Sequence, residues 1–307
     1  MRPGLLHRLS WRLEAGLARL LFALCRALGP VRASNFAAAV MRRIGPLLAV
    51  NRIAETNLRL AFPDRDRAFR RATIRAMWGN LGRVAGELPN LPAIIRAGSA
   101  HDGAGWTIEG AEHVRFLAAG GGPVVFFSGH CGNWEVLPGA AASLGLDFAL
   151  VYRAIGNPHI DAMVQRMRLA GSGQTATKLF PKGAEGARGI LAHLRGKGGL
   201  GLLSDQKMND GIAAPLFGRT AMTAPAAAQL ALRFDCPLIP VCTQHLGPAR
   251  IGIRVEPPLP RPDTGTRAGD VAALTAAMNA RLEAWARDRP GEWLWLHRRF
   301  DKAIYRR

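Results

Sequence analysis

Cysteine is scarce in this sequence. The 307 residues contain four cysteines, Cys25, Cys131, Cys236 and Cys242, and their spacing matches no metal-ligand motif. Three of them lie in apolar segments, so we expect buried, reduced thiols rather than disulfides. The cysteine pattern therefore argues against a disulfide framework and a metal site, and it favours the reducing, cytoplasmic side of a membrane.

Acidic residues are also few. The chain has 22 Asp and Glu against 41 Lys and Arg, a formal net charge of +19. Such a field attracts acidic partners, which include phosphorylated lipid, an acidic protein and nucleic acid. No helix-turn-helix, zinc or RNA-binding signature is visible, and the basic residues do not alternate with aromatic ones as in a base-stacking platform. Nucleic acid is therefore not expected to be a partner.

The first thirty residues carry a leucine stripe. Leucines recur at steps of three and four, which predicts one helix over 5–28, and the arginines lie on a separate face. Glu14 is the only acid in the first fifty residues, and Gly29-Pro30 ends the helix. The stripe comprises Leu6, Leu9, Leu13, Leu17, Leu20, Leu24 and Leu28, and the arginines are Arg8, Arg12, Arg19 and Arg26.

This helix is expected to lie in a membrane interface, with its leucines toward the acyl chains and its arginines at the lipid phosphates. Its longest unbroken apolar run, 20–25, is far shorter than the roughly 20 residues that cross a bilayer. Two alternatives stay open: a helix packed on the protein's own core, and a single-pass span whose arginines snorkel. No small-residue cleavage site follows, so a permanent segment is expected.

The pattern of the chain changes near residue 106. With 49% hydrophobic residues the chain can bury a sizeable core. We predict an amphipathic helix over 1–30, a helical lead-in over 31–105 and an α/β core over 106–307, with a mostly parallel central sheet flanked by helices. Expected strands are 124–128, 148–152, 199–204, 238–243 and 251–255, and expected helices are 53–62, 67–87, 157–170, 184–195, 221–234 and 270–288.

The apolar run 124–128 leads directly into Gly129 and His130. His130 would then lie just past the carboxyl end of a buried strand, where open α/β sheets place their ligands. A neutral imidazole there can take a proton from an alcohol, and Glu135 is expected to orient the ring and stabilise the imidazolium. Taken alone, the pair is more simply a structural loop histidine beside a carboxylate.

Other strand ends also carry polar groups. Arg153 and Asp205 each follow a predicted strand, and Asp205 is expected to hold an arginine in place. Arg166 and Arg168 lie on a helix that Asn157 can cap. Several cations that converge on one sheet edge would form an anion pocket.

Together these segments resemble a known family. Ser-Gly-His-Cys-Gly-Asn-Trp-Glu at 128–135, Tyr-Arg and Asn-Pro within 152–158, and Ser-Asp-Gln-Lys followed by Asn-Asp-Gly within 204–211 are similar to motifs of the bacterial lipid A biosynthesis acyltransferases, the late lauroyl and myristoyl type. Phe217-Gly218 and the closing Trp-Leu-Trp-Leu-His-Arg-Arg-Phe at 293–300 extend the resemblance over about residues 50 to 300. The His-x4-acid element alone is shared with the broader glycerolipid acyltransferases, in which the acid is typically Asp. The family usually has a second aromatic residue where this chain has Leu216.

The resemblance implies a glycerolipid acyltransferase-like fold and roles for individual residues. His130 would be the general base and Glu135 its orienting partner. The family's functional arginine matches Arg168 best, with Arg166 as the alternative, and its functional aspartate matches Asp205. Together with these two, Arg153 and Asn133 are expected to bind substrate.

The resemblance also implies the substrates. The donor would be an acyl thioester on acyl carrier protein or coenzyme A, and the acceptor a hydroxyacyl group on a phosphorylated glucosamine disaccharide. The enzyme would act at the cytoplasmic face of the bacterial inner membrane, with no metal or cofactor.

Direct transfer is the expected mechanism. His130 takes the hydroxyl proton, the oxygen attacks the thioester carbonyl, and donors near the loop stabilise the oxyanion. A covalent route through Ser128 or Cys131 is disfavoured, because neither lies in a Gly-x-Ser-x-Gly elbow. Two other functions stay open: an acyltransferase for another phospholipid or glycolipid, and a basic membrane- or nucleic-acid-binding protein whose His130 is structural.

Overall fold

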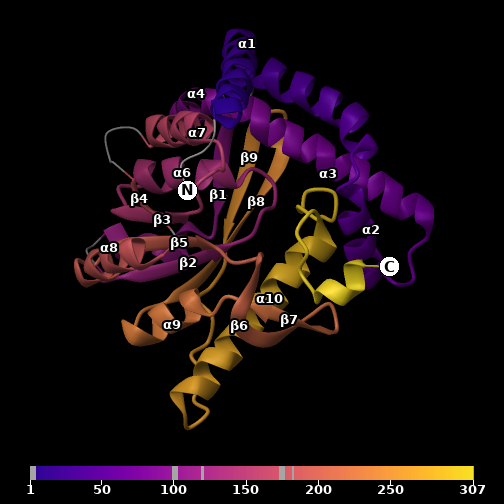
Figure 1. Ribbon diagram of the computed structural model, residues 1–307. Helices are drawn as coiled ribbons and strands as arrows, with labels where there is room; N and C mark the ends of the chain where they lie inside the picture. Colours follow the sequence, from indigo (N-terminus) through magenta and orange to yellow (C-terminus); the bar gives the residue numbers. More distant parts are fainter. Residues whose placement is uncertain (1–4, 99–102, 119–120, 173–176, 182, 307) are drawn as a thin grey trace.

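A seven-stranded, mostly parallel sheet forms the centre of the protein. The structure is a computed structural model that describes residues 5–98, 103–118, 121–172, 177–181 and 183–306. The strands follow the order β1-β9-β8-β2-β5-β3-β4, and helices surround the sheet (Figure 1). Strands β8 and β9 form an antiparallel hairpin, whereas the other neighbouring strands pair in parallel. The expected α/β fold with a mostly parallel sheet is therefore confirmed.

The strands of the sheet are short, and a separate hairpin lies beside them. The sheet contains β1 (Gly105–Glu109), β2 (Val124–Ser128), β3 (Phe148–Tyr152), β4 (Lys178–Pro181), β5 (Gly199–Leu203), β8 (Leu238–Gly247) and β9 (Arg250–Val255). The two-stranded hairpin contains β6 (Lys207–Leu216) and β7 (Arg219–Thr223).

Helices make up most of the remaining chain. Those before the sheet are α1 (Leu5–Ile44), η1 (Gly45–Leu47), α2 (Asn51–Ala61), α3 (Arg67–Glu87), η2 (Leu88–Asn90) and α4 (Leu91–Ala97). Those that follow β1 are η3 (Ala111–Val114), α5 (Arg115–Ala118), η4 (Trp134–Val136), α6 (Leu137–Ser143), α7 (Pro158–Gly171), α8 (Ala184–Arg195), α9 (Ala226–Arg233), α10 (Arg267–Asp288) and η5 (Lys302–Tyr305).

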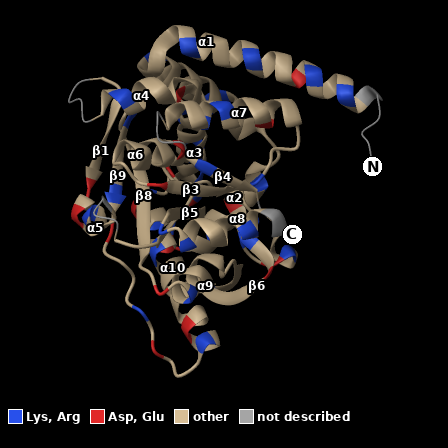
Figure 2. Cartoon of the chain, turned by 90° about the vertical axis from the view of Figure 1, so that its left-hand side faces the viewer, with Lys and Arg blue, Asp and Glu red and all other residues tan. Residues whose placement is uncertain are grey.

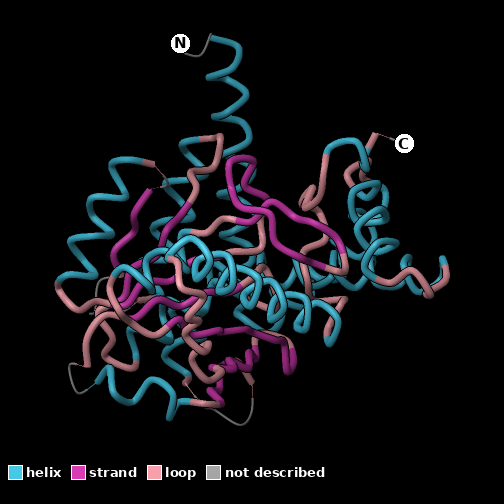
Figure 3. Tube along the Cα trace, turned by 90° about the horizontal axis from the view of Figure 1, so that it is seen from below, coloured by secondary structure: helices cyan, strands magenta, loops and turns pink. Residues whose placement is uncertain are grey.

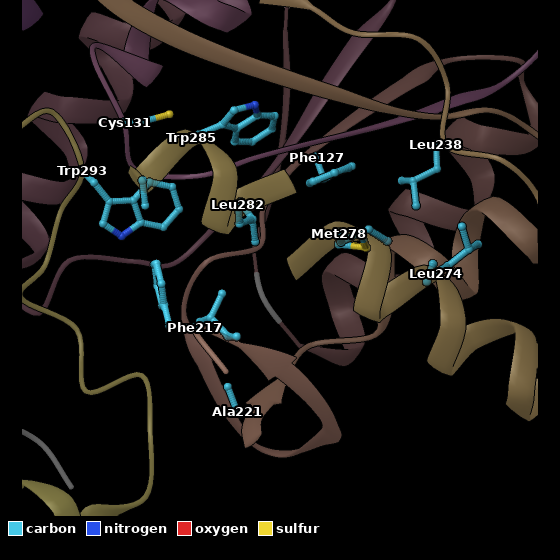
Figure 4. Packing of buried hydrophobic residues seen from close by; sticks show 14 of the residues in the cluster. Phe127, Cys131, Phe217, Ala221, Leu238, Leu274, Met278, Leu282, Trp285 and Trp293 are labelled. Carbon is cyan, nitrogen blue, oxygen red and sulfur yellow. The ribbon is translucent and has the colours of Figure 1, made fainter. Parts of the chain in front are cut away.

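The sheet separates two hydrophobic cores. Successive residues of a strand face opposite sides, so Phe126 and Phe127 of β2 belong to different cores. Phe127 packs with Leu282 and Trp285 of α10 (Figure 4). Phe126 packs on the other face against Phe148. Because both faces are covered, all five residues of β2 are buried, which explains its uninterrupted apolar sequence.

Helices α1 and α3 cross closely enough to require glycine. A Cβ at Gly82 of α3 would lie 2.5 Å from the carbonyl oxygen of Ala37, and one at Gly86 would lie 2.5 Å from that of Ala33. The small residues on both helices let the backbones meet, so the second half of α1 packs closely on α3.

The N-terminal half of α1 packs through a face that contains few leucines. Ala15 and Cys25 are buried, and Ala15 packs in a small core with Met163 and Met167 of α7. The leucine stripe faces outward instead, with Leu13 and Leu17 76% and 60% exposed. Figure 2 shows basic residues along much of this helix, and in Figure 3 its N-terminal part extends beyond the rest of the molecule.

The predicted end of this helix corresponds to a kink. Gly29 leaves the helical region (φ 71°, ψ 168°), and the chain resumes as helix after Pro30 until Ile44. A search of the described residues finds no helix that is both long and apolar enough to span a bilayer.

Most predicted elements are confirmed, several with the predicted bounds. Strands 124–128 and 148–152 and helices 67–87 and 184–195 coincide with β2, β3, α3 and α8. The four free cysteines also agree with the expectation of reduced thiols. Strands β1, β4, β6 and β7 were not predicted.

The predicted helix 221–234 is wrong in its first part. Arg219–Thr223 forms β7, and the helix begins only at Ala226, after Pro225. Phe217 and Gly218 both have positive φ values, 50° and 69°, and so form a tight hairpin turn. This turn folds β7 back onto β6, and the strand pairing overrides the helical appearance of the segment.

Candidate active site

His130 and Asp205 meet at the carboxyl edge of the sheet. His130 follows β2 and Asp205 follows β5, and these strands are parallel neighbours. The ring Nδ1 lies 2.7 Å from Asp205 Oδ1, and the backbone N–H of His130 donates to Oδ2 at 2.9 Å. Because a carboxylate only accepts, Nδ1 carries a proton, and in the neutral ring Nε2 is left with a lone pair. One carboxylate therefore fixes the position and the tautomer of the histidine.

The two groups shift each other's pKa. Burial lowers the pKa of His130, but the charge and hydrogen bond of Asp205, with a smaller contribution from Glu135, raise it above its ordinary value. Burial would raise the pKa of Asp205, yet the charge of His130 and two hydrogen bonds from that residue lower it to about 2. Asp205 is therefore ionised throughout the physiological range.

Glu135 pairs with Arg168 instead of with the histidine ring. Arg168 Nε and Nη2 donate to the two carboxylate oxygens at 2.6 and 2.5 Å, a bidentate arrangement. Trp134 lies between the Glu135–Arg168 pair and the His130–Asp205 pair. Its indole N–H donates to Glu135 at 3.2 Å, and its ring meets that of His130 edge-on with the ring centroids 4.9 Å apart. Glu135 therefore influences His130 electrostatically and through the contacts of Trp134, without a direct hydrogen bond between the two side chains in the described residues.

The structure thus corrects two expected contacts. The sequence predicted that Glu135 orients His130 and that Asp205 holds an arginine, and the partners are exchanged. The physical reason is that η4 turns Glu135 toward α7, whereas the parallel pairing of β2 and β5 brings Asp205 beside His130 across the sheet.

Asn133 holds the loop and lies away from the cavity. Its side chain is fully buried, accepts the backbone N–H of Glu135 at 3.1 Å and donates to Glu87 at 2.6 Å. Among the described residues its amide group thus contacts buried protein groups, and its expected role in substrate binding stays a prediction.

The predicted arginines differ in position. Arg168 is half-buried and binds Glu135, whereas Arg166 is exposed, so Arg168 is the arginine that reaches the site. Arg153, at the end of β3, is exposed and lines the cavity beside the site. Arg153 therefore follows a strand as expected, Arg168 comes from a helix, and a role of either in substrate binding stays a prediction.

An apolar cavity of about 600 Å³ opens at this site. His130, Glu135 and Arg168 line it, together with apolar side chains from β2, α6, α8 and α9. The apolar wall includes Phe126, Leu137, Ala140, Ala141, Ile190 and Leu230. A cavity of this composition can accommodate an extended hydrocarbon chain, with the polar groups positioned around its reactive end.

Two further residues lie around the pair. The ring of His297 is 5.3 Å from that of His130, and its Nε2 is 3.3 Å from the amide nitrogen of Gln206. Arg299 is buried, and burial lowers its pKa to about 10. Both residues belong to the closing motif at 293–300. The motif is far from His130 in sequence, so the sequence did not predict that His297 lies beside His130.

Neither adjacent nucleophile is activated. Cys131 is buried, burial raises the pKa of its thiol, and its Sγ lies 3.6 Å from the carbonyl oxygen of Gly129. Ser128 Oγ contacts the same carbonyl at 3.4 Å. Within the described part of the chain, no group of three or more His, Cys, Asp or Glu side chains could hold a metal ion.

A histidine and its carboxylate at a sheet edge, beside a large apolar cavity, are typical of an α/β enzyme suited to a lipid substrate. Comparison with protein families matches residues 4–302 to the bacterial lipid A biosynthesis acyltransferases. The chain therefore belongs to this family and is an acyltransferase. No curated protein matches the chain.

Proposed function

We propose that this protein transfers a fatty acyl chain from an acyl thioester, carried by acyl carrier protein or coenzyme A, to a hydroxyl of a lipid A precursor, with His130 as the general base. One observation carries the proposal: a histidine held by a buried carboxylate faces a cavity that is otherwise largely apolar. The base has an unprotonated nitrogen, and the cavity offers space for an acyl chain.

The chemistry proceeds by direct attack. His130 Nε2 takes the proton of the acceptor hydroxyl, the oxygen attacks the thioester carbonyl, and the thiolate leaves as the ester forms. Asp205 stabilises the resulting imidazolium. The buried thiol of Cys131 makes a covalent intermediate on that residue unfavourable.

The Glu135–Arg168 pair and Arg153 bind the polar parts of the substrates in this proposal. Arg168 uses Nε and Nη2 on Glu135, and Nη1 is the remaining guanidinium nitrogen that can donate to a substrate oxygen. Arg153 is exposed at the cavity and suits an anionic group such as a phosphate.

We further propose that the enzyme acts at the cytoplasmic face of the inner membrane, with α1 in the interface. The exposed leucines and the arginines on the adjoining face support this placement. In this division of labour, residues 1–30 contact the membrane, 31–105 form the lead-in and 106–307 form the catalytic core.

The decisive experiment is an acyl-transfer assay with labelled acyl groups on acyl carrier protein or coenzyme A as donors and a lipid A precursor as acceptor. His130→Ala is expected to reduce turnover by at least about 100-fold in a protein that still folds, as a circular dichroism spectrum like that of the wild type would show. Wild-type turnover by this variant would disprove the role of His130. Mass spectrometry of lipid A from cells with and without the gene identifies the hydroxyl and the chain length, and an unchanged lipid A would favour another phospholipid or glycolipid as acceptor.

A further inference from the structure

Asn157 connects α7 to α1. Its Oδ1 caps α7 by accepting the backbone N–H groups of His159 and Ile160 at 3.0 and 3.4 Å. Its Nδ2 donates to the carbonyl oxygen of Trp11 and to Glu14 Oε2, both at 2.9 Å. The side chain is buried, so one amide both starts α7 and fastens it to α1.

The helix fastened in this way carries Arg168. Asn157 lies about three turns before Arg168, and α7 packs on α1 through Met163 and Met167. A shift of α7 relative to α1 therefore moves the Arg168 guanidinium that binds Glu135.

The other half of the ion pair is fastened to the same helix by a different route. Asn133, which caps η4, donates to Glu87 Oε2 at 2.6 Å, and Ser34 of α1 donates to Glu87 Oε1 at 2.6 Å. Glu87 is completely buried and also lies 3.0 Å from His245 Nε2. Two buried hydrogen bonds thus connect α1 to the cap of η4, the turn that contains Glu135.

We propose that Glu14 and Ser34 of α1 are positioning residues for the Glu135–Arg168 ion pair, because through Asn157 and Glu87 they fix the caps of the two elements that carry it. A bidentate contact tolerates little displacement, and an element that holds both partners keeps them in register. This inference rests on the proposed function, since there the ion pair binds the polar parts of the substrates. Glu14 is the only acid in the first fifty residues. Its contact with Asn157 gives a reason for a carboxylate in this otherwise basic segment.

The test separates the cap of Asn157 from its contact with α1. Asn157→Asp keeps the acceptor that caps α7 but removes the N–H donors and places a carboxylate beside Glu14. The proposal expects a loss of about tenfold in kcat, less than a twofold change in KM, and unchanged binding to vesicles. Adding Glu14→Gln, which supplies a donor to the new carboxylate, is expected to recover most of the loss. Gln229→Glu is the matched control, because it makes the same amide-to-carboxylate change at an exposed position of α9 and is expected to leave kcat unchanged.

A second measurement does not depend on activity. Amide hydrogen exchange at 134–137 and 158–168 is expected to be faster in Asn157→Asp than in the wild type or the control, because α7 and η4 loosen together. If Asn157→Asp does not fold, Glu14→Ala, which leaves the cap intact, is expected to change both readouts in the same direction by a smaller factor. Unchanged exchange at 134–137, or wild-type kcat in the folded variant, would overturn the inference. Faster exchange in both segments of a protein that transfers no acyl group would uphold the positioning and refute the proposed function instead.

Discussion

Asp205 binds both the ring and the backbone N–H of His130, with one carboxylate oxygen for each. This double contact fixes the histidine relative to the end of β2 as well as its rotation. Asp205 therefore affects three properties of His130 at once: its position, its tautomer and its charge.

Replacement of Asp205 by Asn removes the charge and keeps the shape. We expect Asp205→Asn to lower kcat by about 100-fold or more, because the imidazolium loses its counter-charge and the tautomer is no longer enforced. Steady-state kinetics on the purified variant check this. A smaller effect than that of Glu135→Gln would assign the supporting carboxylate to Glu135 instead.

The pH profile follows from the raised pKa of His130. Only the neutral imidazole accepts a proton, so activity rises with pH through a midpoint above 6.5, the ordinary value. In Asp205→Asn this midpoint is expected to move to lower pH, because the main cause of the raised pKa is gone. The measurement is kcat/KM from pH 5 to 9, and a profile that does not shift would exclude Asp205 as that cause.

The His130–Asp205 pair is expected to make stability depend on pH in two opposite directions. The His130 contribution is complete below about pH 6.5 and is lost as pH rises through its raised pKa, whereas the Asp205 contribution is present above about pH 3.9 and is lost as pH falls toward 2. Thermal melts of the wild type are therefore expected to depend on pH more steeply in both windows than melts of Asp205→Asn. Equal slopes would show that the pair contributes little to folding.

The Glu135–Arg168 pair is expected to serve both activity and stability. Arg168→Ala leaves a nearly buried carboxylate without its cation and is expected to cost about 2 kcal/mol, less than for a fully buried pair because Arg168 is partly exposed. Chemical denaturation and turnover measure the two effects. Arg166→Ala, on the exposed face of the same helix, is the control and should change neither.

The size of the cavity is expected to set the acyl chain length. Ala140 of α6 is 3% exposed and lines the cavity, so Ala140→Phe fills part of it. We expect kcat/KM to fall more for long donors than for short ones, by about tenfold or more in the ratio. Competition between labelled donors of different length checks this, and equal loss for all lengths would place the acyl chain elsewhere.

Membrane binding is expected to depend on the leucine stripe. Leu13→Glu combined with Leu17→Glu should release the protein from anionic vesicles, because both side chains are more than half exposed. The control is Ala23→Glu, an exposed position of the same helix outside the stripe. Sedimentation with lipid measures the effect, and binding retained by the double variant would count against α1 as the contact.

The local pattern was sufficient for many elements and for the location of the site. An apolar run that ends at His130 predicted a buried strand and a polar group at its carboxyl end, because parallel strands covered on both faces have this pattern. The same argument located Arg153 and Asp205. This argument did not find strands β6 and β7, since their pairing depends on a hairpin turn and not on an apolar run.

The sequence by itself determined the ends of β2 and β3, a break in the first helix at Gly29 and the amphipathic character of α1, since each follows from spacing along the chain. Only the tertiary structure decided that Asp205 supports His130, that Glu135 binds Arg168 and that Asn133 is internal. The physical reason is that a hydrogen-bond partner is set by proximity in space. Residues 75 positions apart follow adjacent strands, while a side chain five positions away turns toward a helix.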